Sequence, residues 1–296
     1  MRILTIIVSY NFMPWIDRCL GSLRRSETPV DVMVLDNDSK DETVHVIRRD
    51  YPEVMLRENG ANLGFGRANN IGMRYALEQG YDAVLLLNQD AWVDADVVGK
   101  LASASEQNPQ YGILSPIHLT GGGDAVEHGF AEYSGVHYLA DQPDKDVVGV
   151  KFIDAAIWFI PTSVLRRVGL FAPIFYHYGE DTDLTNRMAY HGYRTGFLPH
   201  IYGYHAREHR QLTRAAFFRS EQVWFLAEYA NINHSLPMAF VWGVVAIGKN
   251  VLRSLFRLRF RDAGTYLGIA FGLVARSAEI VRARRSARRG EVPEKL

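Results

Sequence analysis

Short apolar runs alternate with helical patterns through the first 110 residues of this 296-residue chain. Each run has the length of a buried strand, and each is followed by a segment with the spacing of an amphipathic helix. The predicted strands cover residues 2–8, 30–35, 54–57 and 83–87, and the predicted helices include 15–25, 42–50 and 67–79. Such an order builds a parallel sheet between two layers of helices. We therefore predict an α/β fold with a doubly wound, mostly parallel sheet and helices on both faces.

The second predicted helix carries a clear start signal. Ser39 and Glu42 have the spacing of a capping box, in which each side chain bonds a free backbone N–H of the first turn. The helix is expected to run from there to Asp50.

Two polar clusters directly follow predicted strands. The clusters are Asp36-Asn37-Asp38-Ser39 after strand 30–35, and Asn88-Gln89-Asp90 after strand 83–87. In open α/β sheets, ligands bind beyond the carboxyl ends of the strands. We therefore expect both clusters to line one crevice.

A third acidic cluster opens a predicted helix near residue 180. Glu180, Asp181 and Asp183 fall in its first turn, and His205 closes the extended stretch that follows the helix. Acidic residues at this position also suit the helix dipole, so simple capping is the alternative interpretation. Capping needs one carboxylate, whereas two in succession are placed to meet a ligand. Asp183 is expected to cap the helix or to pair with Arg187 one turn later.

The loop before the third predicted helix reads NLGFGRANNIG. Gly64 lets the backbone approach a ligand or turn sharply, while Asn62, Arg67 and Asn69 present polar groups. The pattern lacks the third glycine of a dinucleotide-binding loop, and Ser-Tyr-Asn follows the first strand in place of glycines. A Rossmann cofactor site is therefore not expected.

Beyond residue 110 the regular alternation ends. Residues 112–117 and 147–160 have the pattern of strands, and glycine-rich and acidic loop segments separate them. We expect these strands to extend or flank the sheet and to form the acceptor side of the crevice.

The last part of the chain has the opposite charge to the rest. The whole sequence holds 33 basic and 33 acidic residues, yet residues 236–296 are strongly basic and residues 1–235 are acidic. Two apolar stretches, 236–248 and 263–275, are each too short for the ~20 residues of a spanning helix. Arginines crowd after both. Basic amphipathic helices lie on anionic membrane surfaces, so the tail predicts a peripheral position on the inner face of the cell membrane.

The tail has two alternative interpretations besides membrane binding. The first is a helical hairpin that packs on the main domain or on a second subunit and leaves its basic ends in solvent. The second is nucleic acid, which nothing basic or aromatic elsewhere in the chain supports, so no nucleic-acid partner is expected. The chain begins directly with the first predicted strand and not with a signal peptide, which predicts a cytoplasmic location.

Five motifs in order resemble the family 2 glycosyltransferases, especially the bacterial rhamnosyltransferase-like group. The motifs are VSYN at 8–11, DNDS at 36–39, NLGFGRANNIG at 62–72, LLLNQD at 85–90, and YGEDTDL at 178–184 followed by His205. The resemblance covers about residues 3–210. It implies a GT-A fold, an inverting transfer from a nucleotide-activated sugar, and a divalent cation.

The resemblance also divides the chain. It implies a GT-A glycosyltransferase domain over residues 1–235, with a nucleotide-binding half at 1–110 and an acceptor-binding half at 111–235. The basic helical tail at 236–296 follows this domain.

The first three motifs are expected to supply the nucleotide site. Its expected residues are Ser9, Asn11, Asp36, Asp38, Asn62, Gly64, Arg67 and Asn69. Among them, Asp36 and Asp38 match positions where relatives hold the base and the ribose.

The last two motifs carry the expected chemistry. Asp90 matches the last carboxylate of the family's D-x-D motif, which binds the metal on the diphosphate, and His205 matches a histidine that completes the metal site in some relatives. Asp181 matches the general base, and Glu180 is expected to orient the acceptor.

The chain departs from the family pattern at three places. Asn88 replaces the first aspartate of D-x-D, which leaves Asp90 as the one acidic ligand of that tripeptide. Ala172-Pro173 stands where many relatives carry Asp-Glu, and Asp154-Ala155-Ala156 stands where a Gly-Ala pair is frequent. These departures bear on acceptor contacts and metal affinity more than on reaction class.

The chemistry of sugar transfer explains the same residue types independently. A leaving diphosphate calls for a hard cation held by oxygen ligands, and Asp90 can supply one of them. His205 suits Mn²⁺ better than Mg²⁺, and a hydrogen-bonded histidine near a sheet end is its alternative role. On the opposite side, the attacking hydroxyl must lose its proton to a carboxylate such as Asp181.

The resemblance therefore implies a metal-dependent, inverting hexosyltransferase that uses Mn²⁺ or Mg²⁺. It implies dTDP-L-rhamnose first and a UDP-sugar second as the donor, and a lipid-linked glycan or a polysaccharide in cell-surface glycan synthesis as the acceptor. The alternative is a non-catalytic nucleotide-sugar-binding or scaffolding protein of the same fold, which the intact Asp90 and Asp181 disfavour. A nucleotidyltransferase would need a glycine-rich, basic loop after the first strand, and Ser-Tyr-Asn stands there.

Overall fold

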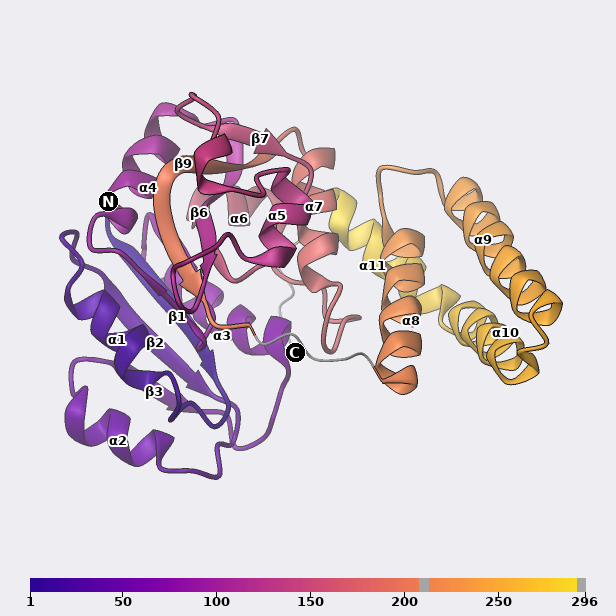
Figure 1. Ribbon diagram of the computed structural model, residues 1–296, viewed down its shortest axis with the longest axis horizontal. Coiled ribbons are helices and arrows are strands. Elements are labelled where there is room, and N and C mark those ends of the chain that lie inside the picture. The colour runs from indigo at the N-terminus through magenta and orange to yellow at the C-terminus, as the bar shows by residue number, and fades with distance from the viewer. Residues whose placement is uncertain (208–212, 292–296) are drawn as a thin grey trace.

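The computed structural model describes residues 1–207 and 213–291 as one large sheet with helices around it (Figure 1). The strands are β1 (Ile3–Ser9), β2 (Asp31–Asp36), β3 (Met55–Glu58), β4 (Ala83–Leu87), β5 (Ala91–Val93), β6 (Tyr111–Thr120), β7 (Val148–Val150), β8 (Ile157–Pro161) and β9 (Arg194–His205). The helices are α1 (Ile16–Arg24), α2 (Thr43–Asp50), α3 (Phe65–Glu78), α4 (Val97–Gln107), α5 (His128–Ser134), α6 (Thr162–Val168), α7 (Glu180–Tyr190), α8 (Arg214–Ala230), α9 (Leu236–Phe256), α10 (Phe260–Ala275) and α11 (Ser277–Arg289).

The sheet is mostly parallel in its first half and mixed in its second. Its strand order is β3-β2-β1-β4-β8-β6-β9-β5, and β7 pairs with β9 beside this path. Strands β1 to β4 pair in parallel, as do β6 and β9, whereas β8 runs antiparallel between β4 and β6. The predicted α/β sheet is therefore confirmed, with its antiparallel members in the part after residue 110.

Alternating side chains of the strands bury two cores, one on each face of the sheet. In β1, Ile3 and Ile7 face α1, α2 and α4, whereas Leu4 and Ile6 face α3, α6 and α7. All four side chains are almost fully buried. Strands buried on both faces read as continuous apolar runs, which is why these runs were visible in the sequence. The predicted helices on both faces are confirmed.

The predicted capping box is wrong. Helix α2 begins at Thr43, and its N-cap residue Glu42 makes no side-chain capping bond. The Ser39 hydroxyl donates to the Asp36 carboxylate, and the Thr43 N–H donates to the Asp41 carboxylate, which takes the capping role. Hydrogen bonds to an ionised group are stronger than neutral ones, so Ser39 bonds the carboxylate at the end of β2 and not the helix.

The second half of the sheet differs from its prediction in two places. The stretch 147–160 forms two separate strands, β7 and β8, because the segment between them turns back toward the sheet edge and carries Asp154 there. Strand β6 continues past the predicted end at Ile117 to Thr120, and this extension carries His118. Both differences bring polar side chains to the same place.

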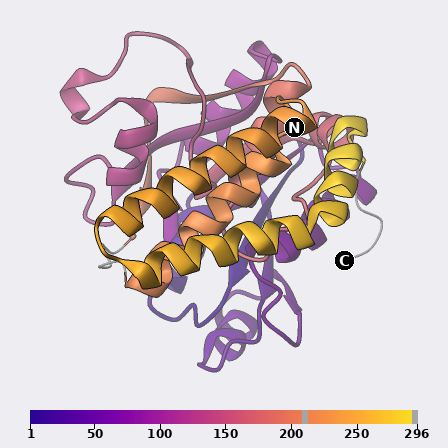
Figure 2. The ribbon, with the colours of Figure 1, turned by 90° about the vertical axis from the view of Figure 1, so that its right-hand side faces the viewer.

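The first helix of the tail is longer than the apolar stretch that predicted it, which covers residues 236–248. Helix α9 spans 21 residues, and within the described residues it is the one helix long and apolar enough to cross a membrane by length and composition. The prediction that each apolar stretch is too short to span is therefore wrong for α9. Helices α9 and α10 lie side by side as a hairpin against α8, and α11 returns to the main body (Figures 1 and 2).

The return of α11 uses two arginines as structural groups. The buried Arg284 donates to the backbone carbonyls of Tyr229, Asn231 and His234, where α8 has ended and lacks its own donors. Arg276 donates to the carbonyl of Ile174. Part of the basic character of the tail therefore stabilises helix ends within the chain.

Candidate active site

The functional candidates gather at one edge of the sheet. Strands β1, β2 and β4 run in parallel and end at Ser9, Asp36 and Leu87. Strand β9 runs parallel to β6 and ends at His205, at the same edge, because β8 is antiparallel to both β4 and β6. The expectation that polar groups at strand ends share one edge is met for both halves of the sheet.

Strand pairing brings Asp90 and His205 together although 115 positions separate them. Ala91 pairs with His205 between β5 and β9, and the Ala206 N–H donates to the Asp90 carbonyl at 2.8 Å. The His205 Nε2 atom lies 3.5 Å from Asp90 Oδ1. Two ligand atoms of one cation lie about 3 Å apart when the metal bonds are about 2.1 Å long, so this pair fits a divalent cation. One oxygen and one imidazole nitrogen are acceptable ligands for Mn²⁺.

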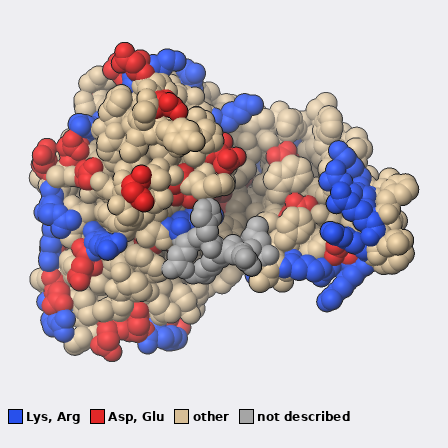
Figure 3. All heavy atoms as spheres, viewed as in Figure 1, with Lys and Arg blue, Asp and Glu red and all other residues tan. Residues whose placement is uncertain are grey.

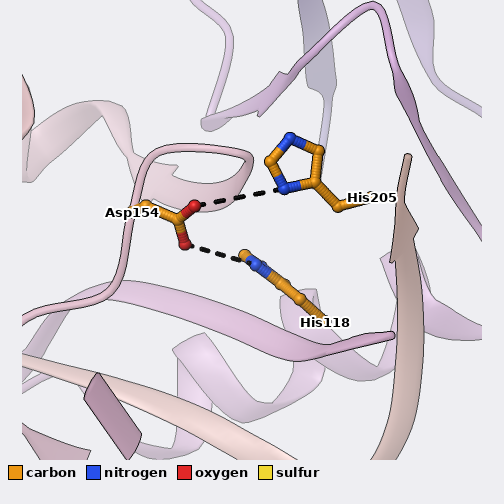
Figure 4. A group of neighbouring side chains, drawn as sticks. All are labelled: His118, Asp154 and His205. Atoms are coloured by element: carbon orange, nitrogen blue, oxygen red, sulfur yellow. Dashed lines mark ion pairs between the residues drawn. The ribbon is translucent and has the colours of Figure 1, made fainter. Parts of the chain in front are cut away.

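A second carboxylate lies on the other side of the His205 ring, and sequence analysis missed its role. Asp154 Oδ2 is 4.0 Å from His205 Nδ1, and Asp154 Oδ1 is 3.4 Å from His118 Nδ1. Figure 4 shows both imidazoles pointing at this carboxylate. The three side chains are grouped closely enough to hold a metal ion. Asp154 had drawn notice only as a departure from a Gly-Ala pair, and no signal marked His118.

The pKa values of the Asp154 and His205 side chains reflect their mutual contact. Burial alone would raise the pKa of Asp154, but His118, His205 and Arg207 together hold it below its ordinary range. Burial alone would lower the pKa of His205, but Asp90 and Asp154 raise it. The ring is therefore set between two negative charges.

Glu180 and Asp181 stand at the start of α7 in a buried setting. Gly179 precedes them in the left-handed region at φ +86°, where a Cβ atom would also collide with Val223. Asp181 Oδ1 accepts the Thr182 N–H at 2.7 Å. Burial, and then the charge of Asp154, raises the pKa of Asp181. A carboxylate of raised pKa is a stronger proton acceptor, so this position suits a general base.

Glu180 is still more strongly affected. Burial, followed by the neighbouring Asp181, raises its pKa from 4.5 to about 7, and its Oε2 atom has no hydrogen-bond partner among the described residues. Two adjacent carboxyl groups with raised pKa values, here one buried and one half-buried, occur more often at functional sites than in surface caps. The plain capping interpretation explains neither the burial nor the pair.

Asp183 has the structural role that its spacing predicted. Its carboxylate accepts from Arg187 Nε at 2.8 Å, and both side chains are almost fully buried. Arg187 also donates to the carbonyls of Val168 and Leu170. The predicted pairing is confirmed, and Asp183 is thereby set apart from the other two acidic residues of the turn.

The raised pKa of Glu180 predicts a pH-dependent gain in stability for Glu180→Gln. A carboxyl group whose pKa is higher in the folded state costs stability as the pH rises from 4.5 to about 7. This rise in the pKa of Glu180 corresponds to a loss of about 3 kcal/mol in the free energy of unfolding, which is complete above neutral pH. Glutamine carries no charge, so the variant should unfold with a higher free energy than the parent above pH 7 and with a similar one below pH 4.5. Denaturant unfolding at several pH values measures this difference.

Glu132→Gln is the control for this comparison, because Glu132 is exposed on α5. Its free energy of unfolding should follow that of the parent at every pH. If Glu180→Gln and the parent have the same free energy of unfolding at every pH, ionisation of Glu180 does not destabilise the folded chain.

Asp36, which was predicted to contact the nucleotide, organises the ends of β1 and β2. Its carboxylate accepts from the hydroxyls of Ser9 and Ser39 and from the Ser39 N–H, and it is almost fully buried. Asn11 joins the same network, because its N–H donates to the Ser39 hydroxyl and its side chain accepts from the Lys40 N–H. Ser9, Asn11 and Asp36 are thus brought together, with the Asp36 oxygens engaged within the chain.

Asp38 and the loop that begins at Asn62 lie around this network. Asp38 forms an ion pair with Lys40 at 2.7 Å. A Cβ atom on Gly64 would lie 2.2 Å from the Tyr176 carbonyl, so the glycine allows the loop to approach the segment before α7. The carbonyl of Asn62 accepts from the Tyr176 hydroxyl. The loop therefore joins the nucleotide side to the acidic cluster of α7.

Two of the predicted nucleotide-site residues, Arg67 and Asn69, lie on α3. Asn69 is almost fully buried, and its amide donates to the carbonyl of Phe65 one turn earlier. Arg67 donates to the Pro173 carbonyl at 3.3 Å, while its Nε atom is buried without a partner among the described residues. Of these two, only Arg67 retains an unpaired donor.

Comparison with known proteins gives a consistent result. Residues 5–165 match the family model described as glycosyl transferase family 2. The chain is 26% identical over 232 residues to an N-acetylglucosaminyl-diphospho-decaprenol L-rhamnosyltransferase of Mycobacterium tuberculosis, which covers 69% of this chain and 76% of the relative. It is 32% identical over 107 residues to an undecaprenyl-phosphate mannosyltransferase of Micrococcus luteus, covering 35% of this chain and 44% of the relative.

Solved structures share the fold at low sequence identity. S. aureus TarS 1-349 superposes with a TM-score of 0.61 at 15% identity, over 98% of this chain and 92% of that one. The mannosyltransferase PcManGT from Pyrobaculum calidifontis, solved with GDP-Man and Mn²⁺, gives a TM-score of 0.59 at 19% identity, over 97% and 83%. The GT-A fold predicted from the motifs is confirmed.

Proposed function

The chain belongs to glycosyl transferase family 2, and from that premise we propose that it transfers a sugar, rhamnose first, from a nucleoside diphosphate to a lipid-linked acceptor with inversion. The observation that carries the proposal is a chain of contacts at one sheet edge. Asp90 contacts His205, His205 lies 4.0 Å from Asp154, and the charge of Asp154 reaches the half-buried Asp181. This links a cation-binding pair to a proton acceptor.

Asp90 and His205 would hold the cation, Mn²⁺ or Mg²⁺, at the donor end. A bound divalent cation neutralises the charge that grows on the departing diphosphate. Ser9, Asn11 and Asp36 support the nucleotide from the ends of β1 and β2. Structures of the fold in complex with UDP, with UDP-GlcNAc, and with GDP-Man and Mn²⁺ support a nucleotide-sugar donor.

Asp181 would act as the general base at the acceptor end. It removes the proton from the acceptor hydroxyl as that oxygen attacks the anomeric carbon from the side opposite the diphosphate, which inverts the configuration. Glu180 has a pKa of about 7, so it is protonated in part at neutral pH and can donate a hydrogen bond that orients the acceptor.

The relatives guide the choice of donor and acceptor. One is an L-rhamnosyltransferase whose name specifies a decaprenol-linked diphosphate sugar, and another is a mannosyltransferase on undecaprenyl phosphate. These names favour a polyprenyl-linked acceptor over a free polysaccharide. We therefore rank dTDP-L-rhamnose first and a UDP-sugar second as donors.

Release of nucleoside diphosphate tests the proposal. The protein is incubated with dTDP-L-rhamnose or UDP-sugars, Mn²⁺, and a polyprenyl-diphosphate-linked N-acetylglucosamine, and the glycolipid product is identified by mass spectrometry. We expect product and acceptor-dependent release of dTDP. Donor binding without product for any acceptor of the panel would favour a non-catalytic nucleotide-sugar-binding protein instead.

We also propose that residues 236–296 attach the catalytic domain, residues 1–235, to the inner face of the cell membrane. Only Ala239, Ile247 and Ser254 are buried among the 21 residues of α9. Its exposed apolar side chains include Trp242 and Phe256, and α10 adds Phe271. A helix so apolar and so little buried within the chain fits a lipid environment.

Charge supports the same partner. The exposed basic residues near the turn between α9 and α10 are Lys249, Arg253, Arg257, Arg259 and Arg261. Figure 3 shows basic side chains gathered at this end of the molecule beside large uncharged areas. Basic groups next to an apolar surface complement anionic headgroups, each worth about 1 kcal/mol near the membrane.

The membrane proposal predicts loss of binding when the apolar face is made polar. Trp242→Ser, Phe256→Ser and Phe271→Ser together should release the protein from anionic liposomes in flotation, because burial of these side chains contributes most of the attachment. Added salt should weaken the binding of the parent without abolishing it. Truncation after Asn233 is a poorer test, because α11 packs on the main body through Arg284.

Tyr138→Ser is the matched control, because Tyr138 is an exposed aromatic residue outside the tail. Its variant should float with the liposomes as the parent does. If the parent itself stays free of anionic liposomes at low salt, the tail has another partner.

A further inference from the structure

His118 and Asp154 are buried polar residues to which the proposed function assigns no contact with the cation, the donor or the acceptor. His118 lies in β6 and is fully buried, and Asp154 precedes β8 with little of its side chain exposed. Phe130 covers the His118 ring, with the ring centroids 4.9 Å apart. Their only polar contact with the candidate site passes through His205 (Figure 4), as far as the described residues extend.

The atoms that face one another here have no hydrogen-bond partner among the described residues. They are His118 Nδ1, Asp154 Oδ1 and His205 Nδ1. Burying such polar atoms costs free energy unless they form hydrogen bonds. Three unpaired atoms in one cluster therefore indicate that the cluster has a functional role. The distances of 3.4 and 4.0 Å are too long for formed hydrogen bonds but short enough for the groups to close on one another.

The chemistry of the groups decides which tautomers can bond Asp154. An ionised carboxylate only accepts hydrogen bonds, so each Nδ1 atom must carry hydrogen when its ring closes on Asp154. The Nε2 atom of His118 is already bonded to the Ser115 hydroxyl at 2.8 Å. With its proton on Nδ1, a neutral His205 ring keeps the Nε2 lone pair free, and that atom faces Asp90.

Arg207 argues against a metal ion inside the cluster itself. Its Nη1 atom lies 3.5 Å from Asp154 Oδ2, the same oxygen that faces His205. A divalent cation held by that carboxylate would meet the guanidinium charge at short range, which is unfavourable. The same arginine suits a carboxylate that stays ionised and accepts protons from two histidines.

We infer that Asp154 and His118 are positioning residues that orient His205 and present its Nε2 lone pair to the cation held with Asp90. The inference rests on the proposed function for the identity of that cation site. Metal-bound histidines usually donate their other ring N–H to a carboxylate, which fixes the ring and its tautomer. His118 then holds the second oxygen of Asp154, so that the carboxylate cannot rotate away.

The protonation of the two rings is a direct test on the unmodified protein. With ¹⁵N-labelled histidine, NMR should find His118 protonated at Nδ1 in the metal-free protein. On addition of Mg²⁺, His205 should be protonated at Nδ1 and unprotonated at Nε2. A proton on Nε2 alone in either ring under these conditions would overturn the inference.

Metal affinity in two variants is the second test. Asp154→Asn should weaken Mn²⁺ binding, followed by the EPR signal of free Mn²⁺, by roughly 10–100-fold, and His118→Asn should weaken it less. In turnover assays the Mn²⁺ concentration for half-maximal rate should rise by a similar factor, and in His118→Asn kcat at saturating Mn²⁺ should stay within a few-fold of the parent. Asp124→Asn, in the exposed loop after β6, should leave both values unchanged.

Stoichiometry separates this inference from the competing one. We expect one Mn²⁺ per chain in the parent and in both variants. Two ions in the parent with one lost in Asp154→Asn, or unchanged affinity in folded Asp154→Asn, would overturn the inference. The failure of the proposed function looks different: Mg²⁺ would not perturb His205 at all, while the Nδ1 proton of His118 would still be observed.

Discussion

Asp181→Asn is expected to abolish sugar transfer while leaving donor binding nearly intact. Asparagine keeps the shape of the side chain but cannot take the proton of the acceptor hydroxyl. Loss of general-base help typically lowers the rate by ~10²–10⁴-fold. The surroundings of Asp181 strengthen this expectation, because a half-buried carboxylate of raised pKa is better matched to proton transfer near neutral pH. Single-turnover kinetics with the true acceptor measures the loss.

The fold of this variant should survive. The Thr182 N–H that now donates to Asp181 Oδ1 can donate equally to the asparagine oxygen. Glu180 and Asp183 remain in the first turn and keep its favourable charge. Donor affinity measured by calorimetry therefore reports an intact site, and a variant with the kcat of the parent would exclude Asp181 as the base.

Asp183→Asn is a control from the same helical turn with the opposite expectation. Its carboxylate pairs with the buried Arg187, so removing the charge leaves a buried guanidinium without its counter-ion. Breaking such a pair costs on the order of 3 kcal/mol. This variant should lose stability but, where folded, retain the chemistry. Asp181→Asn should do the reverse.

Asp90→Ala is expected to remove metal-dependent nucleotide binding, and His205→Ala to weaken it less. The Asp90 carboxylate is a charged ligand, whereas the His205 imidazole is a neutral one. In the tripeptide Asn88-Gln89-Asp90, Asn88 stands where relatives have a carboxylate, so no other carboxylate of the tripeptide can replace Asp90. The loss in Asp90→Ala should exceed the roughly 10–100-fold that outer partners of a metal ligand contribute. Calorimetry with Mn²⁺ and nucleotide together measures both variants.

The pairing of β5 with β9 should outlast the Asp90 substitution. It uses the Asp90 backbone carbonyl, which accepts from the Ala206 N–H and does not need the side chain. Asp94→Ala is the matched control, because Asp94 follows β5 and accepts a hydrogen bond from Tyr204 on the neighbouring strand. Unchanged Mn²⁺–nucleotide affinity in Asp90→Ala would remove this residue from the metal role.

Local patterns predicted the parts of the fold in which burial is continuous. The apolar runs of β1 and β4 and the polar residues just after them are properties of neighbouring positions, and so is the Asp183–Arg187 pair one turn apart. The meeting of Asp90 with His205 followed from the motif order together with the rule that strand ends share an edge.

The rest depended on contacts between distant segments. The role of His118 depends on Asp154, which lies 36 positions later. Asp154 lies between β7 and β8, in the stretch 147–160 that was predicted as one continuous strand. Ser39 could bond either the first turn of α2 or the carboxylate of Asp36, and in the folded chain it bonds Asp36. In α9, the apolar stretch ends at Gly248 and Lys249, but the helix continues to Phe256. Backbone hydrogen bonds with the neighbouring turns extend the helix past these two residues.

The α9–α10 hairpin is fastened at both ends, and this fixes more than its own position. Helix α8 holds it on one side, where Arg284 of α11 also bonds the end of α8, and α11 contacts the α/β body through His191, which bonds the Ala287 carbonyl. If the hairpin attaches to a membrane as proposed, these attachments would limit its movement relative to the sheet. The candidate site would then be held at a fixed height above the bilayer, which would limit the length of the acceptor that it can reach.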